Sequence, residues 1–235
     1  MMFNELSLLL DSQPTAASKS DYQTAILDFN VLDKPTESSR VKSNRIITDL
    51  YGLDNNQTLF RSLRTLYDHS PQALPQLALV LAFCRDALLR KSSELIFRTL
   101  PGQTIPRTDM EDLFEQNYPE HFSEAMKKSL SQNVNTSWTF AGHLSGRTVK
   151  TKTIAPIQPA AAAFAMLAAH LLGLSGAAAI ESVFGKLIST DPHATSYALA
   201  DANSQNLCDF RMSGGITELR FPQFLSETEL DLIHA

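Results

Sequence analysis

The apolar stretch PAAAAFAMLAAHLLGLSGAAAI, which covers residues 159–180, constrains the fold more than any other part of the sequence. Its length would suffice to cross a lipid bilayer. However, Ala dominates it, His170 lies near its middle, and the sequence GLSG at 173–176 divides it. A helix that is apolar on every side also suits the centre of a globular core. We therefore expect two close-packed core helices here, and no membrane among the partners.

A second apolar run, LALVLAFC at 77–84, predicts another central buried helix. The chain of 235 residues is 43% hydrophobic and 19% charged, so it can bury the core of one large or two small domains. Its cysteines, Cys84 and Cys208, form no C-x-x-C pair, which disfavours a disulfide framework or a zinc site. The N-terminus lacks the basic start and the small-residue cleavage site of a signal peptide. We expect a cytoplasmic protein.

Two amphipathic segments near the N-terminus have the pattern of a helix-turn-helix. SDYQTAILDF begins with Ser20 and has Gln23 three residues later, which is a capping-box pattern. After the turn NVLDKP, the segment TESSRVKSNRIITDLYG has Thr36 as its expected N-cap and Gly52 as its expected stop. The side chains expected to face inward are Val41, Ile46, Ile47 and Leu50. Those expected mostly outside are Arg40, Lys42, Ser43, Asn44 and Arg45, and of these Arg40, Lys42, Asn44 and Arg45 are expected to contact nucleic acid.

The middle of the chain has the element order of a winged helix. QTIP predicts a short strand, RTDMEDLFEQN an acidic helix, SEAMKKSLSQNVNTSWTFAGHL a longer helix, and RTVKTKTIAPI a basic β-hairpin. In the longer helix an apolar stripe is expected at Met126, Leu130, Val134 and Trp138. Trp138 could stack on a base, but its place on this stripe favours packing in the core.

The last third predicts more helix, followed by a β-hairpin. ESVFGKLISTDPHATSYALADANSQ is helical with a break at Asp191-Pro192, and LCDFRMSGGITELRFPQFL alternates on both sides of SGG. The fold class we expect is mainly α, with helix-turn-helix and winged-helix units and small β-hairpin wings. Three regions follow: 1–70, a helix-turn-helix-like region; 71–155, a winged-helix-like region; and 156–235, a helical region with a terminal hairpin.

Acidic residues are absent from a long part of this acidic chain. The protein has a formal net charge of −5, yet no Asp or Glu lies between Glu124 and Glu181. Burial explains this for the Ala-rich half, because burying a charge is costly. In the polar part, 125–154, carboxylates would repel a phosphate backbone, whereas Lys and Arg gain by releasing its counterions. The candidate contacts in this part are Lys127, Lys128, Asn135, Arg147, Lys150 and Lys152.

The alternative explanation is a solvated surface that happens to be basic. The overall acidity favours this alternative, because nucleic-acid-binding domains are usually basic as a whole. The expected helix-turn-helix favours nucleic acid. We take nucleic-acid binding as the working hypothesis.

Motifs of catalysis are missing from the sequence. The six histidines include no pair at i, i+4, and the sequence contains no H-E-x-x-H, no G-x-G-x-x-G, no phosphate-binding G-x-x-x-x-G-K-[ST] and no G-x-S-x-G. The acidic cluster at 109–115 is typical of a solvated helix face near an N-terminus. We therefore expect no enzyme, no catalytic residue, no cofactor and no metal.

Two stretches resemble a known family. VLDKPTESSRVKSNRIITDLYGL resembles the N-terminal helix-turn-helix of the BrxA family of bacterial BREX phage-exclusion systems. LALVLAFCRDALLRKSSELIFRTLPGQTIPRTDMEDLFEQ, followed by SLSQNVNTSWTFAGHLSG, is similar to that family's central region, so the likeness covers about residues 20–155. The resemblance implies a non-enzymatic, mostly helical protein that binds double-stranded DNA and acts with larger phage-defence proteins. It carries over DNA contacts to Arg40, Lys42 and Arg45 only.

Two other functions share the expected fold. A protein–protein adaptor would use the winged helix as a scaffold and dock a partner through the Ala-rich surface or the acidic helix at 109–116. A transcriptional regulator would need one specific operator sequence. DNA binding within a phage-defence system remains the function we expect.

Overall fold

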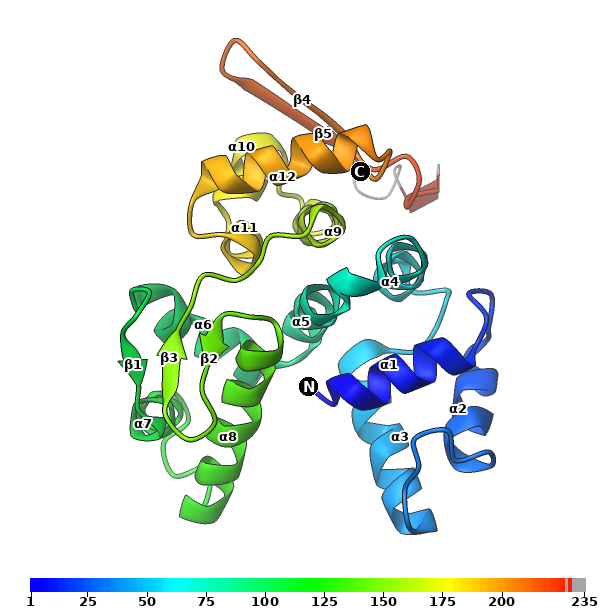
Figure 1. The fold of residues 1–235 in the computed structure, drawn as a ribbon, viewed down its shortest axis with the longest axis vertical. Coiled ribbons are helices and arrows are strands. Elements are labelled where there is room, and N and C mark those ends of the chain that lie inside the picture. Colours follow the sequence, from blue (N-terminus) through cyan, green and yellow to red (C-terminus); the bar gives the residue numbers. More distant parts are fainter. Residues whose placement is uncertain (227, 230–235) are drawn as a thin grey trace. The chain divides into compact units, whose positions relative to one another are not determined.

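The computed structural model describes residues 1–226, 228 and 229, and these are mainly helical with two small antiparallel sheets (Figure 1). Internal contacts divide the chain into two compact units. The inserted unit comprises Ala82–Pro156 together with Met1, and the split unit comprises Met2–Leu81 and Ile157–Ala235. The predicted region 71–155 overlaps the inserted unit, whereas 1–70 and 156–235 fall almost wholly within the split unit.

In the inserted unit a helix is followed by a strand, two helices and two strands. These elements are α6 (Ala87–Arg98), β1 (Thr104–Ile105), α7 (Arg107–Asn117), α8 (Glu124–Phe140), β2 (Leu144–Ser145) and β3 (Lys150–Lys152). The central strand is β3, which pairs antiparallel with β1 and with β2. Figure 1 shows this sheet beside α7 and α8. The strand predicted at QTIP is therefore confirmed. Of the hairpin predicted at RTVKTKTIAPI, one strand, β3, lies in that range, whereas its hairpin partner β2 lies before it.

Trp138 of α8 lies in the core of the inserted unit. It is fully buried, and its indole Nε1 donates a 2.7 Å hydrogen bond to Oγ of Ser92 on α6. The rings of Phe97 and His143 pack edge-on against it, with centroids 5.7 and 5.1 Å away. The prediction that Trp138 packs in the core is confirmed.

The split unit contains the remaining elements. They are α1 (Phe3–Ser12), α2 (Lys19–Leu27), α3 (Glu37–Tyr51), α4 (Thr58–His69), the 3₁₀ turn η1 (Pro71–Ala73), α5 (Leu74–Arg85), α9 (Pro159–His170), α10 (Gly176–Glu181), α11 (Val183–Ile188), α12 (Pro192–Ser204), β4 (Asp209–Ser213) and β5 (Ile216–Arg220). Helix α5 belongs to the split unit as far as Leu81, and its last four residues belong to the inserted unit.

The Ala-rich stretch forms two helices, as predicted. Every residue of α9 from Ala160 to Ala169 is buried, and α9 contacts α4, α10, α11 and α12. The segment 171–175 separates α9 from α10. Small Ala side chains let four neighbouring helices approach one central helix closely. Among the residues described, no single helix is both long and apolar enough to span a membrane, although Pro71–Arg85 and Ala87–Arg98 together, bent at a short break, meet those criteria.

The boundaries of α3 are those predicted, but α2 and the turn before α3 differ from the prediction. Thr36 caps α3 with Ser39 in a capping box, and α3 stops at Gly52. The capping box of α2 uses Ser18 and Asp21 instead of Ser20 and Gln23, because the Asp21 carboxylate accepts the Ser18 N–H at 2.7 Å. The turn 28–36 is also much longer than the three to four residues typical of a helix-turn-helix.

The terminal hairpin predicted around SGG is confirmed. Strands β4 and β5 pair from Asp209↔Arg220 to Ser213↔Ile216, and Gly214 and Gly215 both adopt positive φ in the two-residue turn. Such a turn needs positive φ at both positions, which Gly adopts without strain. Asp191 caps α12 by accepting the N–H of His193, and this explains the break at Asp191-Pro192.

Candidate nucleic-acid interface

The core-facing side of α3 differs from the predicted one. Ser43, Ile47 and Tyr51 are buried at spacings of four, whereas Val41 is 53% exposed. The predictions that Val41 faces inward and that Ser43 lies outside are therefore both wrong. The apolar side chains alone could not fix the rotation of the helix, because the small polar Ser43 occupies a core position.

This rotation separates the four predicted contacts of α3 into two pairs. The Arg40 guanidinium donates a 2.7 Å hydrogen bond to the carbonyl of Leu27, at the end of α2, so Arg40 connects the two helices. Asn44 is half-buried, and its Oδ1 atom is enclosed without a hydrogen-bond partner among the residues described. Only Lys42 and Arg45 are exposed. The contact surface available on α3 is thus smaller than predicted.

Lys127 is committed to an ion-pair cluster. Its ammonium lies 2.7 Å from Oε2 of Glu115 on α7 and 2.5 Å from Oε1 of Glu124, and only 11% of its side chain is exposed. The hydrogen bonds to Glu115 and Glu124 raise the pKa of Lys127 above its usual range, against the effect of desolvation. The prediction that Lys127 is exposed is therefore wrong. Residues 125–154 contain no acid of their own, but Glu115 on α7 pairs with Lys127.

Lys152 and Lys150 lie on the core-facing side of the sheet. Paired residues of antiparallel strands share a face, and Lys152 pairs with buried Leu144, while Lys150 pairs with buried Ile105. Lys152 is only 5% exposed, and burial lowers its pKa to about 8. The Lys150 ammonium donates to the carbonyl of Gly146 at 2.7 Å, and burial lowers its pKa as well. The expectation that both lysines are exposed is wrong.

The buried side of α8 is also rotated from the predicted stripe. Val134 and Trp138 are buried as predicted, but Met126 is 49% exposed, whereas Ser131 and Asn135 are buried. A spacing of four residues drifts by about 40° per step around a helix of 3.6 residues per turn. Met126 therefore lies well outside the face that contains Trp138, and Asn135 cannot contact a ligand at the surface.

The structure instead brings together exposed polar side chains on the opposite side of α8. We define the α8 outer face as Lys128, Ser129, Gln132, Asn133 and Thr136, all of which are exposed. In the described part of the chain, the side-chain amides of Gln132 and Asn133 have no hydrogen-bond partner. Sequence reasoning missed four of these five residues. Placing Trp138 at the centre of the buried side would have identified them, because they lie opposite it.

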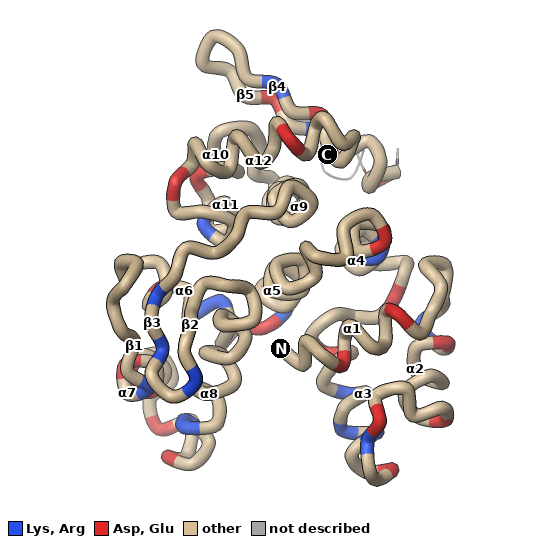
Figure 2. The backbone as a smooth tube through the Cα atoms, viewed as in Figure 1, with Lys and Arg blue, Asp and Glu red and all other residues tan. Residues whose placement is uncertain are grey.

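Arg147 lies next in the chain, in the exposed turn between β2 and β3. The turn is tight, because a Cβ atom on Gly146, which has φ +90°, would lie 2.2 Å from the carbonyl oxygen of Val149. Arg147 and Val149 are both exposed. Within residues 1–226, 228 and 229, neither Lys128 nor Arg147 has an ion-pair partner. Figure 2 shows no acidic position along β2, β3 and α9.

The described residues offer no group of three or more side chains that could hold a metal ion. Burial raises the pKa of the Cys84 thiol to about 11 and that of Cys208 to about 12, so both thiols stay protonated at neutral pH. Of the six histidines, His234 lies outside the described residues.

No known family matches the chain, and neither the curated proteins nor the solved structures contain a detectable relative.

Proposed function

We propose that the inserted unit binds double-stranded DNA as a winged helix, with the α8 outer face toward the major groove and the β2–β3 turn beside it. The order α6, β1, α7, α8, β2, β3 supports this proposal, because a winged helix has the same sequence of elements and the same central third strand. In such a unit the second helix after the first strand, here α8, presents its exposed side to the groove.

The observation that carries the proposal is the chemical make-up of the α8 outer face. It contains one Lys, two amides and two hydroxyls, and no carboxylate. Amides and hydroxyls donate to phosphates and read base edges, and Lys neutralises a phosphate. Arg147 adds a second cation from the turn. In the split unit, Lys42 and Arg45 on α3 supply a second, smaller contact surface.

The structure leaves few free cations, which sets the expected strength of binding. Each phosphate contact contributes about 0.9 to the slope of log K against log salt concentration. Lys128 and Arg147 together therefore give a slope of about −2 for the inserted unit, and the two cations of α3 can add a similar amount. We expect weak binding with little sequence preference, with Kd on the order of 10⁻⁴–10⁻⁶ M at physiological salt.

A titration with matched variants tests the proposal. Fluorescence anisotropy with a random-sequence duplex is measured over a range of salt concentrations. Lys128→Ala and Arg147→Ala should each weaken binding and reduce the salt slope by about 1. Lys127→Ala is the control from the same helix, because its ammonium is already paired with Glu115 and Glu124. Equal losses in Lys127→Ala and Lys128→Ala, or no duplex binding at all, would refute the interface.

A protein–protein adaptor is the second candidate, and α8 gives it some support. Met126 and Phe140, on the same side of α8 as the α8 outer face, are 49% and 41% exposed. Exposed apolar side chains beside polar ones are common in protein interfaces. The same titration, repeated with duplexes of defined sequence, separates the candidates. No rise in anisotropy with any duplex favours the adaptor, and a rise with a single sequence favours a regulator.

We further propose that the protein acts with other phage-defence proteins. The likeness of residues 20–155 to the BrxA family supports this part of the proposal. Genes for a methyltransferase, a large ATPase and a phosphatase-like protein beside its own would agree with it, and a neighbourhood without any of them would contradict it.

A further inference from the structure

A carboxylate lies at the first turn of α4, where this helix has no cap of its own. Gln57, the N-cap residue of α4, makes no capping hydrogen bond with its side chain. The carboxylate of Glu229 occupies this end of the helix, far from α4 in sequence. The N-terminal end of a helix attracts negative charge. The Glu229 carboxylate therefore interacts favourably with this end of α4, which the Gln57 side chain leaves uncapped.

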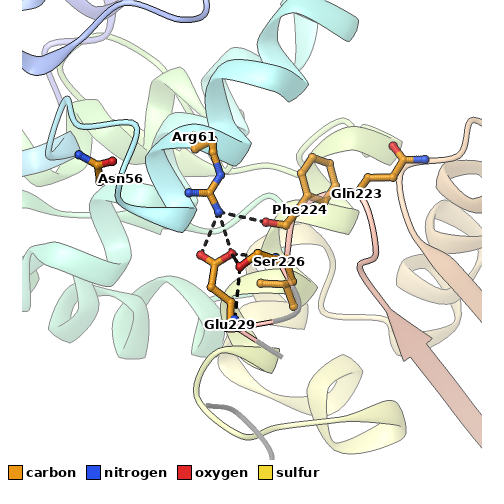
Figure 3. Close-up of a pocket in the computed structure, with 7 residues that line it drawn as sticks. Asn56, Arg61, Gln223, Phe224, Ser226 and Glu229 are labelled. Atoms are coloured by element: carbon orange, nitrogen blue, oxygen red, sulfur yellow. Dashed lines mark hydrogen bonds and ion pairs between the residues drawn. The ribbon is translucent and has the colours of Figure 1, made fainter. Parts of the chain in front are cut away.

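Two side chains of α4 hold the Glu229 carboxylate. The guanidinium of Arg61 donates to both carboxylate oxygens, at 2.9 and 3.0 Å, and Thr58 donates its hydroxyl to one of them. Arg61 is itself held in place by the carbonyls of Asn55 and Phe224, at 3.1 and 3.3 Å. Figure 3 shows the guanidinium of Arg61 directed at the Glu229 carboxylate. The donors are therefore fixed by contacts other than those to the anion.

The remaining donors come from the segment that carries Glu229. The backbone N–H and the hydroxyl of Ser226 each donate to Oε2 of Glu229 at 2.8 Å. Burial acts to raise the pKa of Glu229, but the hydrogen bonds from Thr58, Ser226 and Arg61 lower it to about 2. Glu229 is thus an anion at neutral pH. If this segment moved away, Thr58 and Arg61 would stay on α4 as a set of anion donors.

The site is open to solvent. It lies in a surface hollow that Asn56, Gln223 and Phe224 also line, and the side chains of Arg61 and Glu229 are 38% and 24% exposed. Both contacts to Glu229 come from the Nη2 atom of Arg61, and a guanidinium N–H donates to phosphate oxygens as it does to carboxylate oxygens. A small oxyanion can therefore reach the donors that Glu229 now uses.

We propose that Thr58 and Arg61 form an oxyanion-binding site that the chain fills with its own Glu229, so that a phosphate group competes with the Glu229 carboxylate for α4. Binding of a phosphate-bearing ligand would then release Glu229 from Thr58 and Arg61. The site lies in the split unit and is independent of the DNA-binding proposal for α8.

Thermal unfolding of Glu229→Ala tests the vacated site, with inorganic phosphate as the probe and chloride at equal ionic strength as the reference. Phosphate at roughly ten times its Kd should raise the Tm of Glu229→Ala by about 3–6 °C. The gain should disappear in the double variant Glu229→Ala/Arg61→Met. Glu218→Ala, which removes an exposed carboxylate from β5, is the control and should respond to phosphate like the wild type.

Carboxyl-carbon NMR of the wild-type protein tests the competition and needs no substitution. Phosphate should shift the side-chain carboxyl resonance of Glu229, because phosphate takes over the donors Thr58 and Arg61, and should leave that of exposed Glu218 unchanged. Thr58→Ala should shift the Glu229 resonance without phosphate. The proposal is wrong if phosphate stabilises Glu229→Ala no more than the double variant, or if the Glu229 resonance of the wild type does not respond to phosphate.

Discussion

At the scale of single residues, Lys152 opposes the stability of the fold at neutral pH. The residue as a whole is only 5% exposed, and in the described part of the chain no carboxylate pairs with it. Burial lowers its pKa to about 8, compared with about 10.4 for a free lysine. Between these two values the unfolded chain binds more protons, so the free energy of unfolding rises as the pH increases from about 8 to about 10.4.

Lys152→Met should therefore stabilise the protein at pH 7, by up to about 3 kcal/mol, because a tenfold change in proton affinity is about 1.4 kcal/mol. The variant should also lose the rise in stability above pH 8. Urea unfolding at pH 7 and at pH 10 measures both effects. Lys128→Met is the control, because its side chain is exposed. Equal stabilities of Lys152→Met and the wild type at pH 7 would show that Lys152 reaches water.

The residues that sequence analysis misplaced share one physical cause. Lys127, Asn135 and Lys152 are polar, and polar side chains are mostly exposed, so we expected them outside. Their burial depends on partners far away in the chain: Glu115 pairs with Lys127, and the strand register turns Lys152 inward. No local pattern contains that information. Trp138, an aromatic residue on an apolar stripe, was placed correctly.

At the scale of elements, Arg64 joins α4 to the end of α1. Its buried guanidinium donates to the carbonyls of Leu10 and Gln13, at 3.0 and 3.2 Å, and lies 3.2 Å from the carboxylate of Asp68. These carbonyls belong to the C-terminal end of α1, which otherwise lacks donors from the helix itself. One side chain thus completes the hydrogen bonding of one helix end and fixes a second helix against it.

Arg64→Met should cost about 3–5 kcal/mol of unfolding free energy, because breaking a buried charged network leaves its other groups unpaired. Urea unfolding monitored by circular dichroism measures the loss. Arg45→Met on the exposed side of α3 is the matched control and should change stability by less than about 0.5 kcal/mol. A similar result for the two variants would mean that α1 does not depend on Arg64.

Sequence patterns predicted the ends of elements better than their rotation. Thr36, Gly52 and the SGG turn marked true boundaries, because caps and turns depend on local backbone chemistry. The rotation of α3 and α8 depends on which side meets the rest of the fold. Ser43 and Ser131 occupy core positions that a hydrophobic stripe does not reveal. The candidate interface therefore lies on the predicted helix, but of the contacts predicted on that helix only Lys128 belongs to it.

At the scale of the whole molecule, the chain forms the first part of the split unit, then the inserted unit, and then the second part of the split unit. The split unit is made from both ends of the sequence, and its halves meet where α4 contacts α9. The sequence divided naturally into three consecutive regions, because composition changes along the chain but carries no sign of which distant helices pack together. Only tertiary contacts identify the insertion.

This topology predicts the outcome of a single cut. Cleavage of the peptide bond after Arg147, in the exposed β2–β3 turn, should leave the two fragments bound to each other, because the α4–α9 contact and the β3 pairings still join them. Gel filtration should give one peak at the intact size in native buffer and two peaks in urea. Two peaks in native buffer would mean that the core of the split unit does not hold without the covalent connection.

The double connection of the inserted unit, after Leu81 and after Pro156, has a consequence for multivalent binding. The candidate surfaces on α3 and α8 belong to different units, yet two peptide links tether them. One of these links, after Leu81, lies inside the helix α5. A duplex long enough to engage both surfaces at once would gain avidity from two individually weak contacts and would be retained over a duplex that engages one.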